Sequence, residues 1–270
     1  MTYIQAAILG LVQGLTEFLP ISSSAHLVLV PAYLGWDIHE SQAFIFDVLV
    51  QWGTLLAVLI YFRKDILLIS RATLRSLKNR SLNDTNAKIG WMIIIATLPA
   101  AVIGLLVFDR IEVIFVLPQL AGWLLLVTAV FLVAAEMIGG RTRDLESINS
   151  FDALLVGATQ ALALLPGISR SGATIAGAMS RNLKREVAAR FSFLMSIPVM
   201  IGAGILALIR LSEIPNMASF SNALLIGFII SAIVGYLSIR WLLNFLASRS
   251  LYSFSIYCAA FGIISIWFFR

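Results

Sequence analysis

Two long apolar stretches of this chain are each broken by a short polar loop, and the loops lie 147 residues apart, counted from Ser22 to Ser169. The first loop spans residues 20–26 and reads PISSSAH, and the second spans residues 166–174 and reads PGISRSGAT. Hydroxyl, imidazole and guanidinium groups are costly inside a bilayer, where arginine alone costs roughly 2.5–3.5 kcal/mol at a helix centre. The two loops therefore indicate a functional site.

The composition places these loops in a membrane protein. Apolar residues make up 60% of the 270 residues and charged residues only 12%, a balance that excludes an ordinary soluble domain. Cys258 is the only cysteine, so neither an intrachain disulfide nor a cysteine metal site is available. We therefore interpret the chain as a polytopic membrane protein.

Basic residues are concentrated in one connecting segment. Residues 63–88 contain seven Lys/Arg and only two acidic residues, Asp65 and Asp84. The positive-inside rule predicts that this segment is cytoplasmic, where membrane lipid headgroups are its expected partners. No RNA- or DNA-binding motif accompanies these residues, so we expect no nucleic acid partner.

Six segments are apolar over about 20 residues, the length that crosses a bilayer. They cover residues 43–62, 91–108, 117–137, 187–209, 223–246 and 250–269. The flanking charges place both ends of each broken stretch, 1–30 and 151–180, on one side, so each stretch is expected to enter the membrane and return. The predicted fold class is an all-α polytopic membrane protein forming a single domain over 1–270.

Each half of this fold is predicted to contain one re-entrant helix-loop-helix and three transmembrane helices, with repeat one at 1–140 and repeat two at 150–270. An odd number of crossings inverts the second repeat relative to the first. Five residue pairs are identical at the offset of 147: Gly10/Gly157, Gln13/Gln160, Ile21/Ile168, Ser22/Ser169 and Ser24/Ser171. Inverted repeats with broken helices usually form their site where the repeats meet.

The chemistry of the loops favours an anion. A half-helix is expected to begin near Ala25 and another near Gly172, and a helix N-terminus offers free N–H groups and a partial positive charge. Arg170 adds a guanidinium fork, which suits phosphate or carboxylate. Hydroxyl donors, among them Ser22, Ser169, Ser171 and Thr174, favour an anion with several oxygens. We therefore predict phosphate rather than carboxylate as the bound group.

Gln13 and Glu17 are four residues apart and therefore share one helical face just before the first loop. Their oxygens suit a divalent cation such as Mg²⁺ or Ca²⁺, which would need substrate oxygens to complete its shell. The alternative is that Glu17 pairs with Arg170. The two arrangements are compatible at different stages of a reaction cycle.

His26 follows Ser23 by three residues and could act as a general acid or base. A histidine in a half-helix is more often a hydrogen-bonded structural residue. Its place beside three serines, nine residues after Glu17, favours the functional interpretation.

These motifs resemble a known family. Residues 13–26, QGLTEFLPISSSAH, are similar to the (Glu/Gln)-x-x-x-Glu motif and its serine and histidine extension in bacterial undecaprenyl-diphosphate phosphatases of the bacitracin-resistance type. Residues 166–174 resemble that family's second signature, Pro-Gly-x-Ser-Arg-Ser-x-x-Thr. Both motifs are long and occur in the expected order, in a chain of the expected length.

The resemblance implies an inverted-repeat enzyme of the plasma (cell inner) membrane, with an active site opening to the periplasmic or extracellular side. Its expected reaction converts the C55 prenyl diphosphate lipid to the monophosphate and inorganic phosphate. This recycles the lipid carrier for peptidoglycan synthesis and confers bacitracin resistance.

By position, the resemblance makes Glu17 the essential, metal-linked carboxylate, Gln13 its partner and Ser23 the nucleophile. His26 would be the acid or base, and Arg170 would clamp the diphosphate, aided by Ser169, Ser171 and Thr174. Gln at position 13 is an allowed variant of the motif, and it leaves one carboxylate for the metal.

Three alternatives stay open. The strongest other function is a transporter or flippase for a phosphate-bearing lipid, because inverted repeats that meet at re-entrant loops are a transport architecture. Either Ser23 or a water molecule could attack phosphorus. The sequence also allows a homo-oligomer.

Overall fold

The computed structural model describes residues 1–38, 40–114, 117–209 and 217–270. This described part is helical and contains no strand, which confirms the predicted all-α class. Its elements are α1 (Tyr3–Thr16), α2 (Ser23–Tyr33), α3 (Glu40–Tyr61), α4 (Arg63–Asn79), α5 (Thr85–Ile114), α6 (Pro118–Ile138), the short 3₁₀ helix η1 (Leu145–Ser147), α7 (Ser150–Leu162), α8 (Arg170–Ser180), α9 (Arg185–Ile209), α10 (Met217–Leu246) and α11 (Tyr252–Phe268).

Within the described ranges, five helices are long and apolar enough to cross a membrane. These candidate spans are Gln42–Tyr61, Thr85–Val107, Pro118–Ile138, Arg185–Ile209 and Phe220–Leu246. They agree with five of the six predicted crossings. Large side chains such as Leu106 (77% exposed) and Trp267 (72% exposed) face outwards, as is expected of a surface that contacts lipid. The chain is a multi-pass membrane protein.

The sixth predicted crossing, 250–269, corresponds to α11. This helix is apolar but only 17 residues long, about 25 Å at 1.5 Å per residue. It packs along α6. Its length is at the lower limit for a bilayer span.

Helix α4 was not predicted, because the cluster of charges in 63–88 marked this segment as a connection. The structure forms an amphipathic helix there, with Ile69, Ala72 and Ser76 buried. Trp91 of α5 donates a hydrogen bond from Nε1 to Ser76 Oγ over 3.0 Å. Packing against α5 therefore provides the stability that the charged composition did not indicate.

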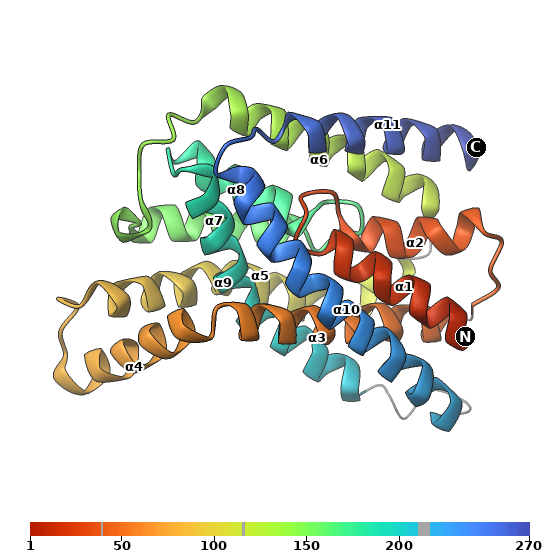
Figure 1. Ribbon diagram of the computed structural model, residues 1–270, viewed down its shortest axis with the longest axis horizontal. Helices are drawn as coiled ribbons and strands as arrows, with labels where there is room; N and C mark the ends of the chain where they lie inside the picture. Colours follow the sequence, from red (N-terminus) through yellow and green to blue (C-terminus); the bar gives the residue numbers. More distant parts are fainter. Residues whose placement is uncertain (39, 115–116, 210–216) are drawn as a thin grey trace.

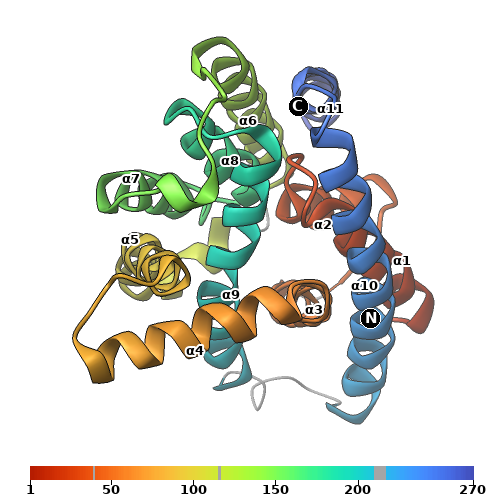
Figure 2. The same cartoon turned by 60° about the vertical axis from the view of Figure 1, so that its left-hand side comes forward.

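The two broken stretches form helix-loop-helix units, α1–α2 and α7–α8. Figure 1 shows the units entering from opposite ends of the molecule, with their loops meeting near its middle. The second helix of each unit begins at Ser23 or Arg170, two residues before the predicted starts at Ala25 and Gly172. Helix α9 runs through the middle of the bundle and contacts α3, α5 and α8 (Figure 2).

The two units pack in corresponding ways. Helix α1 lies along α10, and α7 lies along α5. A Cβ atom on Gly10 would lie 2.6 Å from the carbonyl oxygen of Gly227, and one on Gly157 would lie 2.4 Å from that of Ala96. Both close approaches therefore require glycine, at two positions that correspond in the proposed duplication. The inverted repeat and its boundaries at 1–140 and 150–270 remain a prediction.

Asp152, near the start of α7, joins the first turn of α7 to the end of α8 in the second unit. Its carboxylate accepts hydrogen bonds from Arg143 over 2.6 Å and from Arg181, just after α8, over 2.7 Å. The same carboxylate caps its own helix through the backbone N–H of Asn149. The ends of α7 and α8 are thus tied together, which sets the position of the loop between them.

Candidate functional site

The first loop connects α1 to α2 through a strained turn. Ser22 has φ 69°, a left-handed conformation that non-glycine residues rarely adopt. Its hydroxyl accepts the backbone N–H of Ala25 over 3.3 Å and pairs with Ser24 Oγ over 3.2 Å. Ser22 is therefore the N-cap that lets α2 begin at this depth.

The second loop has the same serine arrangement. Ser169 Oγ accepts the backbone N–H of Gly172 over 3.0 Å and pairs with Ser171 Oγ over 3.1 Å. Thr128 of α6 holds this loop, since its hydroxyl donates to Gly167 O over 3.0 Å and accepts from Ser169 N over 2.9 Å. The loop is thus fixed on a neighbouring helix before any ligand binds.

The two loops contact each other directly. Ser171 Oγ donates to the carbonyl oxygen of Leu19 over 2.9 Å, and Gly167 N donates to Ser24 Oγ over 3.4 Å. Arg170 Nη2 forms an ion pair with Glu17 Oε1. Residues that are 153 positions apart in the chain therefore belong to one site.

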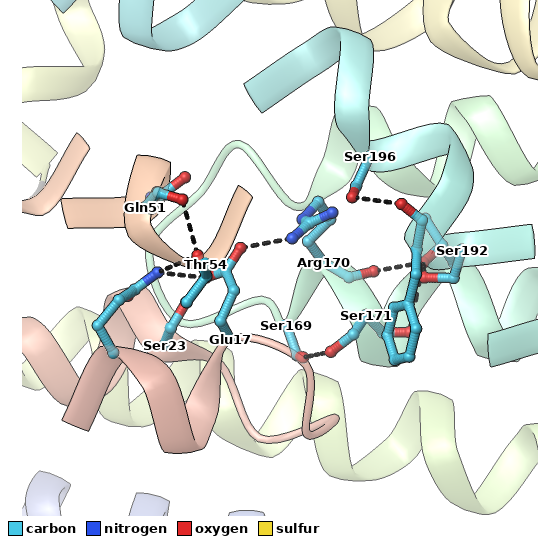
Figure 3. Close-up of polar contacts among 12 residues, drawn as sticks. Glu17, Ser23, Gln51, Thr54, Ser169, Arg170, Ser171, Ser192 and Ser196 are labelled. Atoms are coloured by element: carbon cyan, nitrogen blue, oxygen red, sulfur yellow. Dashed lines mark hydrogen bonds and ion pairs between the residues drawn. The ribbon is translucent and has the colours of Figure 1, made fainter. Parts of the chain in front are cut away.

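Glu17 is the centre of the hydrogen-bond network (Figure 3). Its Oε2 atom accepts hydrogen bonds from Ser23 Oγ over 2.5 Å and from Gln13 Nε2 over 2.8 Å, while Oε1 binds Arg170. The Glu17 side chain is only 4% exposed, against 16% for Arg170. Burying a carboxylate is costly unless it is paired and hydrogen-bonded, and here Ser23 and Arg170 supply partners from both units.

A cavity of about 150 Å³ opens beside this network. One part of its lining is polar: Glu17, Ser22, Ser23, Ser24, Gln51, Gln160, Ser169 and Arg170. The other part is apolar: Phe44, Val48, Ala163, Leu164, Ile168, Val199, Met200 and Ala203. The site can therefore hold a polar head group and an apolar chain side by side.

The predicted site residues fall into two groups. Glu17, Ser22, Ser23, Ser169 and Arg170 line the cavity. Gln13, Ser171, Thr174 and His26 are not among the lining residues, and their side chains bond to neighbouring groups of the protein instead.

Thr174 illustrates this supporting position. Its hydroxyl donates to the carbonyl oxygen of Arg170 over 2.7 Å and pairs with Ser192 Oγ of α9 over 2.6 Å. It therefore holds the backbone of the arginine in place. A direct contact of Thr174 with substrate stays a prediction.

The His26 ring packs against α11. Its Nδ1 atom is 2.8 Å from the carbonyl oxygen of Ser22, and its Nε2 atom is 2.8 Å from Tyr257 Oη. The ring also stacks on Phe261, with centroids 5.0 Å apart. The acid or base role predicted for His26 therefore requires one ring nitrogen to exchange its present partner for a reacting group.

Sequence reasoning assigned no function to Ser24, Thr54 or Gln160. Thr54 of α3 is 3.4 Å from Gln13 Nε2, and Gln160 lines the cavity. Two of these residues carried a signal in the sequence, because at the offset of 147 Gln160 matches Gln13 and Ser24 matches Ser171; Thr54 carried none.

Glu17 and Gln13 fit a divalent cation only together with a substrate. The described part of the chain has no group of three or more His, Cys, Asp or Glu side chains that could hold a metal ion. Gln13 turns its nitrogen towards Glu17, and its buried Oε1 has no hydrogen-bond partner among the described residues. A cation there would use Gln13 Oε1 and a Glu17 oxygen released by one of its donors, with further oxygens from the substrate.

Comparison with known proteins finds matches along nearly the whole chain. A family model described as bacitracin resistance protein BacA matches residues 6–264. The chain is similar to the undecaprenyl-diphosphatase of Anaeromyxobacter sp. (strain K), with 42% identity over 97% of this chain and 90% of the relative. It is similar also to the undecaprenyl-diphosphatase of Chlorobium phaeovibrioides, with 44% identity over 98% of this chain and 96% of the relative. The chain therefore belongs to the BacA family of bacitracin resistance proteins.

Proposed function

We propose that this protein is an integral membrane phosphatase that hydrolyses undecaprenyl diphosphate to undecaprenyl phosphate and inorganic phosphate. The observation that carries the proposal is the convergence of Glu17, Ser23 and Arg170 from two loops beside one cavity. Relatives at 42% and 44% identity over nearly the whole chain carry the name undecaprenyl-diphosphatase. These two findings point to the same chemistry.

Phosphoryl transfer depends mainly on positioning and on neutralising the phosphoryl oxygens. Arg170 uses one nitrogen on Glu17 and has further N–H donors for the distal phosphate. The N-termini of α2 and α8 add partial positive charge. In this arrangement the substrate's distal phosphate lies between the two loops.

The attacking group has two candidate identities. In the first, Ser23 Oγ gives its proton to Glu17 and attacks the terminal phosphorus; the bond to the prenyl phosphate breaks, and water later hydrolyses the phosphoserine. In the second, Glu17 accepts a proton from a water molecule that attacks directly. In both routes the prenyl monophosphate leaves and inorganic phosphate is the second product.

The apolar wall of the cavity suits the prenyl chain. Val48 lies on α3, Met200 and Ala203 lie on α9, and the three line the same cavity as Arg170. We propose that the chain follows this wall between α3 and α9 while the diphosphate faces the loops.

A divalent cation, Mg²⁺ or Ca²⁺, is part of the proposal and binds together with the substrate. Glu17 and Gln13 would hold it, and it would neutralise charge on the diphosphate. Chelation with EDTA is expected to abolish phosphate release, and either ion should restore it. Full activity in EDTA would contradict this part of the proposal.

The cellular role follows from the reaction and the family. We propose that the protein lies in the plasma (cell inner) membrane, with the site opening to the periplasmic or extracellular side. Hydrolysis there would return the lipid carrier to peptidoglycan synthesis, and the lower level of its diphosphate would confer bacitracin resistance.

The direct test is phosphate release from undecaprenyl diphosphate by the purified protein in detergent. We expect steady turnover that ceases in Glu17→Gln. Terminally ³²P-labelled substrate with a rapid acid quench distinguishes the two routes, since only the serine route leaves label on the protein. Absence of phosphate release with every divalent ion tested would overturn the proposed function.

A transporter or flippase for a phosphate-bearing lipid is the second candidate. The observation in its favour is the meeting of two loops that enter from opposite ends of the molecule (Figure 1). Proteoliposomes with labelled prenyl diphosphate on one side separate the two functions. Movement of intact lipid without phosphate release would support this candidate.

A further inference from the structure

We propose that Gln160 is a phosphate-binding residue of this site and that its Nε2 atom donates a hydrogen bond to a non-bridging oxygen of the diphosphate. The inference rests on the proposed function. It adds a second-repeat residue to the machinery, on α7 rather than in either loop.

The inference rests on a buried side-chain amide that has no hydrogen-bond partner among the described residues. Gln160 is 2% exposed, yet neither its Oε1 nor its Nε2 atom has a hydrogen-bond partner within the described ranges. Burying an amide without hydrogen bonds costs roughly 1–3 kcal/mol in proteins. Such a group is retained at a cost to stability, which is typical of a residue that serves a ligand.

Gln160 lines the same cavity as Arg170. The cavity lining includes Gln160, Ser169 and Arg170 from the second repeat together with Glu17 and Ser23 from the first. Amide N–H and guanidinium groups are both donors suited to phosphate oxygens. A phosphate bound by Arg170 in this cavity would therefore meet the free amide.

The matching residue of the first repeat explains why this amide is free. Gln13 donates to Glu17, which follows it by four residues along α1, over 2.8 Å. Four residues after Gln160 the chain has Leu164, which offers no side-chain acceptor. The second unit keeps the glutamine but lacks its intramolecular partner, so the amide can donate to a ligand.

The first experiment measures binding without turnover. The full-length protein in detergent is titrated with farnesyl methylenediphosphonate, a diphosphate analogue that cannot be hydrolysed, by isothermal calorimetry. In Gln160→Leu we expect affinity to fall about tenfold or more, since hydrogen bonds to charged groups are the stronger ones. Gln119→Leu makes the same change at an exposed position of α6 and should bind normally.

Thermal unfolding without ligand separates a binding role from a structural one. If the amide serves the ligand, Gln160→Leu is as stable as the wild type or more stable, because it removes a buried group without partners. If the amide supports the fold, the variant unfolds at lower temperature while the folded fraction binds normally. That result would overturn the inference.

Gln160→Glu provides a second variant of nearly the same shape. A carboxylate facing the phosphate replaces a donor by a like charge, so affinity should fall about a hundredfold. In turnover assays Gln160→Leu should raise KM more than it lowers kcat, as expected for a binding contact. Binding and KM within twofold of the wild type in both variants would refute the role of Gln160.

The inference and the proposed function fail in different ways. If the wild type binds the analogue but releases no phosphate from the natural substrate, the phosphatase proposal fails while the variants still report on Gln160. If the wild type turns over and both variants do so equally well, the phosphatase proposal stands and the Gln160 inference fails.

Discussion

The two loops share a scaffold and differ in their chemistry. In each, one serine caps the following helix and the serine two residues later forms a hydrogen bond with the other unit: Ser22 and Ser24 in one, Ser169 and Ser171 in the other. At the same offset of 147 the side chains proposed to react, all from the first helix-loop-helix unit, correspond to different residues in the second unit. These pairs are Glu17/Leu164, Ser23/Arg170 and His26/Ala173.

The difference shows how two turns with the same serine arrangement can serve two purposes. The serine caps solve a structural problem that both loops have, namely starting a helix at membrane depth. The carboxylate, the central serine and the histidine belong to the α1–α2 unit, and the arginine belongs to the α7–α8 unit. Neither unit forms the site by itself, because the buried carboxylate of Glu17 is paired with Arg170 of the other unit.

The largest effect on phosphate release is expected when the carboxylate of Glu17 is removed, because the second unit has no counterpart of it. Glu17→Gln keeps the shape but removes the proton acceptor, so phosphate release should fall at least about a thousandfold, or about 4 kcal/mol. Initial rates with undecaprenyl diphosphate provide the measurement.

Glu146→Gln, at an exposed position, is the matched control and should keep wild-type rates. If Glu17→Gln releases phosphate at a rate within tenfold of the wild type, then the carboxylate does not account for the chemical difference between the two units.

The second largest effect on turnover is expected at Arg170, which has no basic counterpart in the first unit. Arg170→Lys keeps the charge but loses the guanidinium fork, so kcat/KM should fall about a hundredfold, or about 2.7 kcal/mol. The same assay measures it, with Arg249→Lys at an exposed position as control. Equal rates for lysine and arginine would show that a point charge suffices.

Backbone strain differs between the loops as well. Gly167 has φ 117°, and a Cβ atom there would lie 2.5 Å from Leu124 Cβ and 2.8 Å from Ala121 O. Gly167→Ala should therefore lower stability by about 2 kcal/mol or more, measured by thermal unfolding in detergent. Ser22→Gly relieves a positive φ but removes a helix cap, so its net effect should stay below about 1 kcal/mol.

Gly202→Ala is the control for both variants, since no atom lies within 4 Å of the added Cβ. In the middle of α9 it should be neutral or stabilising by up to about 1 kcal/mol. Similar stability for Gly167→Ala and Gly202→Ala would show that the second loop tolerates a side chain.

The smallest effect on turnover is expected at His26, whose counterpart is Ala173. His26→Gln should lower kcat about tenfold, or about 1.4 kcal/mol. A pH–rate profile gives the decisive measurement, because an acid or base role removes one limb of the profile. A uniformly lowered profile, matched by Tyr257→Phe, would instead assign the ring to positioning Ser22.

The sequence alone determined the all-α membrane class, five of the spans and the two helix breaks, because these depend on local hydropathy and on proline, glycine and serine at the breaks. It also pointed to Glu17, Ser23 and Arg170, since a costly polar group in an apolar stretch is visible without coordinates. It did not predict α4, whose stability comes from packing against α5.

Only the tertiary structure decided which of these residues face the cavity. His26 and Thr174 lie in the expected loops but bond to Tyr257 and Ser192, partners that no local pattern specifies. Gln160 matches Gln13 in sequence, yet its free amide becomes evident only once its surroundings are known. The physical reason is that local sequence sets where helices start and stop, whereas contacts between distant segments set what each side chain can bind.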